Sequence, residues 1–147
     1  MIRLRVADFF TTAFALIVAM SISIDAYAEL RIDVKTKTYS VKGATGYQIW
    51  RSMLKKGPYS RSLRQRVWAV TSGKIKYSTN SRRANGSCRV NNPTVTMNIV
   101  YTMPEVRNRL KPKSAKIWKK MYRLLVVHER VHGQIYTDLA KNAYADL

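Results

Sequence analysis

The chain has 147 residues, including 27 Lys and Arg, 8 Asp and Glu, 2 His and a single Cys. This length suits one domain and excludes a large multidomain enzyme. Because 46% of the residues are hydrophobic, the chain can bury a core. The formal net charge of +19 favours anionic surroundings such as nucleic acid, lipid headgroups or cell-envelope polymers. A single Cys excludes an internal disulfide framework and a cysteine-based zinc ribbon, since both need several cysteines.

Residues 1–28 have the features of a secretory signal peptide. A short positive stretch precedes a mostly apolar stretch over 9–20, and Ala26-Tyr27-Ala28 is a small-x-small cleavage site. The apolar run is shorter than the roughly 20 residues that span a bilayer, which makes a membrane anchor the weaker interpretation. We therefore expect export to the periplasm or the exterior. The mature domain would cover 29–147 and contain no transmembrane segment.

The mature domain keeps the charge and the cysteine of the whole chain. Removing residues 1–28 takes away two Arg and two Asp, so the net charge stays at +19. An exported protein meets an oxidising environment, in which Cys88 has no internal partner. Because free cysteines are mostly buried, we expect Cys88 to be buried rather than available for an intermolecular bond.

A strand and a helix are predicted at the start of the mature domain. From Leu30 to Lys35 apolar and charged residues alternate, which predicts a half-buried strand that ends near Gly43. Over 46–56 apolar residues recur at helical spacing, and Gly57-Pro58 ends the pattern.

Strand patterns dominate the middle of the chain. Residues 66–77 favour a strand, with Ser72-Gly73 as a possible internal turn. A polar segment with the turn signal Asn85-Gly86 follows. Alternating apolar residues then predict another strand over 90–101, closed by Pro104.

The last part of the chain, 114–147, has the 3.6-residue period of a long amphipathic helix. Gly133 lies inside this stretch, and no Pro interrupts it. Because the predicted strands are mostly consecutive, we expect an α+β fold. It would have a small antiparallel sheet and a long C-terminal helix. Because this helix carries the pattern H-E-x-x-H at 128–132, we expect the arrangement to be zincin-like.

The most informative residues lie on this helix, where His128-Glu129-Arg130-Val131-His132 matches the pattern H-E-x-x-H. Two His four residues apart leave one helix face a turn apart, so both imidazoles can reach one Zn²⁺ at about 2.0–2.1 Å. Glu129 can then take the proton of a zinc-bound water, and the resulting hydroxide attacks a polarised carbonyl. The alternative is two core histidines with an incidental Glu, including a site that has lost its metal.

A third zinc ligand is harder to assign, although catalytic zinc usually has three protein ligands and a water. Asp138 has the spacing of the third ligand in H-E-x-x-H-x-x-G-x-x-[HD], but Ile135 replaces the required Gly. On an unbroken helix Asp138 points about 80° away from His128, so it needs a helix break, for example near Gly133. Other carboxylates that remain open as the third ligand are Asp33, Glu105 and Asp146.

Tyr136 lies four residues after His132, on the predicted metal face of the helix. Its hydroxyl could donate to an oxyanion or contact the substrate, or it could complete the zinc coordination. Simple packing against the core is the alternative.

Several short segments of the mature chain resemble the bacterial family called domain of unknown function 922, described as predicted secreted zinc-dependent proteases. The resemblance implies a small exported metallopeptidase-like domain, with His128 and His132 as ligands and Glu129 as base, and it supplies no substrate. The matching segments are Tyr39 leading to Gly43, a helix ending in Gly57-Pro58, Trp68-Ala69-Val70-Thr71, Gly86-Ser87-Cys88-Arg89-Val90, Met103-Pro104, and Ile117-Trp118 ahead of His128-Glu129-x-x-His132.

Basic residues cluster at several places along the chain. These clusters could bind anionic envelope polymers, or they could simply be solvated. Export disfavours a specific nucleic-acid partner, and no named nucleic-acid-binding motif is present. The clusters are Lys55-Lys56, 61–66, Arg82-Arg83 and 107–123.

Together these patterns predict an exported hydrolase with Zn²⁺ as cofactor and Glu129 as catalytic base. It is most directly a metallopeptidase acting on a peptide or protein. A substrate peptide could pair with an exposed strand edge, for which 90–101 is the candidate. The alternatives are a non-catalytic basic module that binds the cell envelope, and a zinc amidase acting on peptidoglycan peptides.

Overall fold

The computed structural model describes residues 28–147, so the predicted signal peptide lies outside the described part except for Ala28. None of the described helices is long and apolar enough to cross a membrane. The elements in chain order are β1 (Glu29–Val41), α1 (Gly46–Lys56), β2 (Tyr59–Ser60), β3 (Gln65–Arg66), β4 (Val70–Ala84), β5 (Ser87–Val106) and α2 (Pro112–Ala145).

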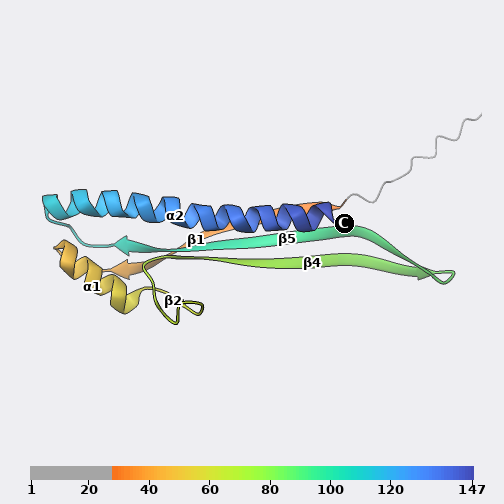
Figure 1. Ribbon diagram of the computed structural model, residues 1–147, viewed down its shortest axis with the longest axis horizontal. Helices are drawn as coiled ribbons and strands as arrows, with labels where there is room; N and C mark the ends of the chain where they lie inside the picture. The colour runs from red at the N-terminus through yellow and green to blue at the C-terminus, as the bar shows by residue number, and fades with distance from the viewer. Residues whose placement is uncertain (1–27) are drawn as a thin grey trace, which may run out of the picture.

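The central strand β5 pairs with β1 on one side and with β4 on the other, and α2 lies along one face of this sheet (Figure 1). The predicted α+β fold with a long C-terminal helix is confirmed. The expected antiparallel sheet is right for β4 and β5 but wrong for β1, which runs parallel to β5. The reason is the place at which β4 begins. Thr102 of β5 is opposite both Lys37, near the end of β1, and Val70, at the start of β4, so β4 begins at the end of the sheet where β1 finishes. Strand β4 therefore runs antiparallel to β1, and β5 returns between them in the direction of β1.

A tight turn at Asn85-Gly86 joins β4 to β5, as predicted. Both residues have positive φ, 52° and 76°, which a type I′ hairpin turn requires. The possible turn at Ser72-Gly73 does not form, because β4 continues through it. Cys88 follows the hairpin turn and is exposed, so the expectation of burial is wrong. The tip of this hairpin extends beyond the end of α2, so among residues 28–147 no helix lies over it (Figure 1).

Two apolar clusters hold the helices against the sheet. Alternation along β5 turns every second side chain toward α2, and each fully buried aliphatic side chain contributes about 1.5–3 kcal/mol relative to exposure. The first cluster consists of Val95, Met97, Ile99 and Ala140, and the second of Val41, Ile49 and Met53. The first cluster fixes the C-terminal half of α2 over the sheet.

Helix α1 has the predicted bounds, because Thr45 and Gln48 form a capping box at its start. The segment that follows, 57–69, contains the two-residue strands β2 and β3, which are too short to leave a periodic signal in the sequence. Arg66 Nη1 donates to the Gly57 carbonyl at 2.7 Å and ties the two ends of this segment together.

Tyr39 fixes the far end of the same segment to β1. Its hydroxyl donates to the Trp68 carbonyl at 2.6 Å, and burial raises the pKa of Tyr39 to about 12. The segment 57–69 is therefore held at both ends beside the sheet.

Gly57 provides a test of how tightly this segment closes. A Cβ at Gly57 would collide with the Val67 carbonyl and would lie 2.7 Å from the Met53 carbonyl oxygen. Backbone atoms cannot move aside as a side chain can, so we expect Gly57→Ala to lower the free energy of unfolding by about 1–3 kcal/mol, measured by urea denaturation. Gly46→Ala is the matched control. A Cβ there meets nothing within 4 Å, and stability should rise by up to about 1 kcal/mol. Equal effects of the two changes would contradict the packing described.

Candidate functional site

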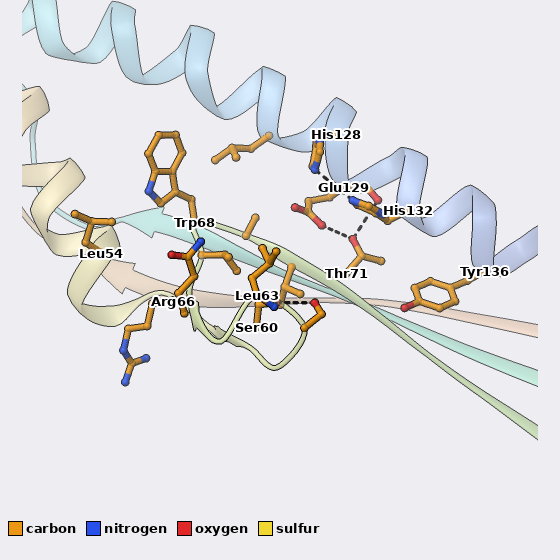
Figure 2. A pocket seen from close by; sticks show the side chains of 16 residues that line it. Leu54, Ser60, Leu63, Arg66, Trp68, Thr71, His128, Glu129, His132 and Tyr136 are labelled. Atoms are coloured by element: carbon orange, nitrogen blue, oxygen red, sulfur yellow. Dashed lines mark hydrogen bonds between the residues drawn. The ribbon is translucent and has the colours of Figure 1, made fainter.

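A pocket of about 690 Å³ lies between α2, the start of β4 and the segment 57–69 (Figure 2). Helix α2 contributes His128, Glu129, His132 and Tyr136, so the predicted site residues apart from Asp138 lie together in one wall. The opposite wall, which the sequence did not predict, includes Ser60, Leu63, Arg66 and Trp68. A cavity of this size is typical of small-molecule and peptide sites.

The two histidines face each other across one helical turn. His128 Nε2 and His132 Nε2 lie 3.2 Å apart, and the two rings meet edge to face at an interplanar angle of 77°. In a tetrahedral zinc site with bonds of 2.0–2.1 Å, two ring nitrogens lie about 3.3 Å apart. The pair also suits a hydrogen bond between neutral imidazoles, in which one ring donates and the other accepts. The spacing and the donor chemistry of the pair therefore fit a zinc ion.

Glu129 is 4% exposed, which is exceptional for a carboxylate in a protein of this size. Its partner is Thr71 on β4, whose Oγ1 donates to Oε2 at 2.6 Å. The same hydroxyl lies 3.1 Å from the backbone oxygen of Glu129. Through this short hydrogen bond, Thr71 fixes one carboxylate oxygen of Glu129.

Tyr136 extends the same wall by one helical turn. A Cβ at Gly73 would collide with the Tyr136 ring, so the glycine of β4 provides the space in which this ring packs. Figure 2 shows the hydroxyl end of Tyr136 directed toward Thr71 and His132. The ring therefore packs against β4 while the residue also lines the pocket, and its expected contact with a substrate stays a prediction.

The structure does not bring Asp138 to the histidines. Helix α2 continues unbroken past Gly133, and Asp138 is exposed, where it accepts a hydrogen bond from Gln134 Nε2 at 2.8 Å. Within residues 28–147, no three His, Cys, Asp or Glu side chains form a cluster that could hold a metal ion. Glu105 instead accepts hydrogen bonds from Thr38 and Arg107. Asp138 could reach the histidines only if the helix broke between them. Because the helix is unbroken, the structure does not support Asp138 as the third ligand.

Thr71 is a residue of the candidate site that sequence reasoning missed. It lies 58 positions from Glu129, and a single Thr in a strand pattern carries no signal of its own. Its membership of the segment Trp68-Ala69-Val70-Thr71, which resembles the family, was the only available hint.

The model of the family described as bacterial protein of unknown function (DUF922) matches residues 36–147. The chain belongs to this family. The match includes every residue of the pocket, while the family description names no reaction. No curated protein and no solved structure matches the chain.

Thr71→Val tests the contact that holds Glu129. The change leaves a buried carboxylate oxygen without its donor, so we expect a loss of about 1–3 kcal/mol in the free energy of unfolding at pH 7. Thr71→Ser keeps the hydroxyl and should restore most of the loss.

Thr38→Val is the matched control, because Thr38 Oγ1 makes the same kind of bond to Glu105 at an exposed site. For Thr38→Val we expect the free energy of unfolding to change by no more than about 0.5 kcal/mol. Urea denaturation of the three variants measures the difference. A loss at Thr71 no larger than that at Thr38 would mean that Glu129 does not depend on this bond.

Proposed function

We propose that this protein is an exported zinc-dependent hydrolase, most directly a metallopeptidase. The observation that carries the proposal is the 3.2 Å separation of the His128 and His132 ring nitrogens, beside a buried carboxylate in the wall of a pocket. Two core histidines would be expected to lie inside the protein. Both of these are exposed on the pocket side of α2, which favours a ligand-binding role.

In the proposed reaction, His128 Nε2 and His132 Nε2 hold the zinc ion. When bound, zinc would polarise a substrate carbonyl and lower the pKa of water. Thr71 occupies Oε2 of Glu129, which leaves Oε1 to take the proton of the attacking water. Glu129 then passes this proton to the leaving amine. Tyr136, from its place in the pocket wall, can donate a hydrogen bond from its hydroxyl to the developing oxyanion.

The substrate strand belongs beside β4 rather than along 90–101. The prediction for 90–101 is wrong because β5 is paired on both sides. In contrast, β4 is an edge strand of the three-stranded sheet, and Val70 and Thr71 at its start line the pocket. An extended peptide that pairs with this edge would carry its carbonyl past Glu129. Leu63 and Trp68 on the opposite wall offer apolar contacts to a substrate side chain.

Zinc binding is the first test. We expect near-stoichiometric zinc in the purified chain from Glu29 to Leu147, measured by plasma mass spectrometry, and none in the double variant His128→Ala, His132→Ala. Asp138→Asn should keep its zinc, because Asp138 lies away from the pair. Tyr136→Phe separates two roles. Loss of zinc would assign the hydroxyl to coordination, and retention would leave it for the substrate. Absence of zinc from the unmodified protein, even when zinc is offered, contradicts the proposal.

Turnover is the second test. Glu129→Gln should keep zinc and lower kcat at least about a hundredfold, because the amide cannot accept the proton. Asp138→Asn removes a carboxylate from the same helix and should leave kcat unchanged. An unfolded protein substrate and muropeptides, supplied side by side, distinguish a peptidase from an amidase. Equal turnover by Glu129→Gln and the unmodified enzyme would exclude Glu129 as the base.

A further inference from the structure

Helix α2 carries an apolar stripe on the side that faces away from the sheet. Its six aliphatic residues are each 50–61% exposed. At 100° per residue they fall within an arc of about 120°, and they extend over about 33 Å of helix. Exposed aliphatic residues on soluble monomers are usually scattered, whereas a continuous stripe marks an interaction surface. The stripe consists of Ile117, Leu124, Val127, Val131, Ile135 and Leu139.

One side of this stripe is strongly basic. At 100° per residue, four exposed Lys and Arg residues lie on that flank of α2. Two more, Lys113 and Lys120, lie within the arc of the stripe itself, as does Asp138, the one acidic residue on this side of the helix. Neither ion pair found among residues 28–147 involves any of the six, so their charge is not neutralised by such a pair. The basic flank consists of Lys116, Arg123, Arg130 and Lys141.

The other side of the stripe borders the candidate site. His132 lies between the stripe and the buried face of the helix, where Glu129 and Ala140 pack, and His128 lies just inside this edge of the stripe. The same helix therefore presents a basic flank, then an apolar stripe, with the histidine pair at the edge of the stripe opposite the basic flank.

We propose that this face of α2 binds an anionic lipid bilayer surface. An apolar stripe beside Lys and Arg matches helices that lie in the plane of a membrane, with aliphatic side chains among the acyl chains. The long basic side chains can then reach the lipid phosphates. A second copy of the chain is a poorer occupant, because it carries the same net charge of +19 and would be repelled. The proposal stands apart from the hydrolase function and requires neither zinc nor turnover.

The bound orientation has a consequence for the site. With the stripe on the lipid, His128 and His132 would lie at the membrane surface, and the pocket would receive polypeptide close to the bilayer.

Vesicle co-sedimentation tests the proposal with the chain from Glu29 to Leu147, which contains every described helix and strand. Vesicles of equal parts phosphatidylglycerol and phosphatidylcholine should bind the protein, and vesicles of pure phosphatidylcholine should bind it at least about tenfold more weakly. Leu124→Asp with Val131→Asp should lower binding to the anionic vesicles about a hundredfold. Val34→Asp with Leu147→Asp is the matched control. These aliphatics are 56% and 57% exposed, lie off the stripe, and should have a much smaller effect.

Charge reversal tests the basic flank in the same assay. Arg123→Glu with Arg130→Glu should reduce binding to the anionic vesicles about tenfold or more. Lys74→Glu with Lys76→Glu gives the same net charge on the sheet face away from α2, beyond about one Debye length from the lipid, and should have little effect. Equal losses from the two reversals would mean nonspecific attraction by total charge and would overturn the proposal.

Two further measurements also test the proposed lipid binding. His128→Ala with His132→Ala should keep full vesicle binding, so failure of the zinc site leaves this proposal intact. Sedimentation velocity should show a monomer in the absence of lipid. A dimer that Leu124→Asp with Val131→Asp dissolves would identify the stripe as a contact between copies, and would overturn the lipid assignment.

Discussion

The packing of one unbroken helix across three strands is the constraint on which the rest of the structure depends. Helix α2 approaches the sheet closely because two glycines provide space. A Cβ at Gly133 would collide with Tyr101 of β5, and a Cβ at Gly73 of β4 would collide with Tyr136. These contacts and the buried Ala140 set the depth and rotation of the helix. That rotation fixes which α2 residues meet β4 and which remain outside.

The candidate site is a product of this rotation. Glu129 turns inward and meets Thr71, while the two histidines of the same turn stay at the border of the helix face and reach the pocket. Further around, the aliphatic stripe and the basic flank face outward. The buried carboxylate, the histidine pair and the proposed lipid-binding face thus lie on one rigid element, so their relative positions cannot change independently.

Local patterns predicted the parts of the fold that depend on neighbours in the chain. The bounds of α1 followed from helical spacing and the Gly57-Pro58 stop, and Asn85-Gly86 specified its own turn. Local patterns did not predict how strands far apart in the chain pair. The direction of β1 depends on where β4 begins, and alternation alone is the same in parallel and antiparallel strands. The exposure of Cys88 depends on how far the hairpin extends past α2.

The sequence by itself determined that His128 and His132 share one helix face a turn apart, since four residues of helix always produce that geometry. It also determined that Asp138 points elsewhere unless the helix breaks. Tertiary structure alone decided that Glu129 is buried against Thr71, that 57–69 forms the opposite pocket wall, and that β4 is an edge strand. Helical periodicity arises from bonds between near neighbours. These other features arise from contacts between segments far apart in the chain, and no local sequence pattern identifies which segments will meet.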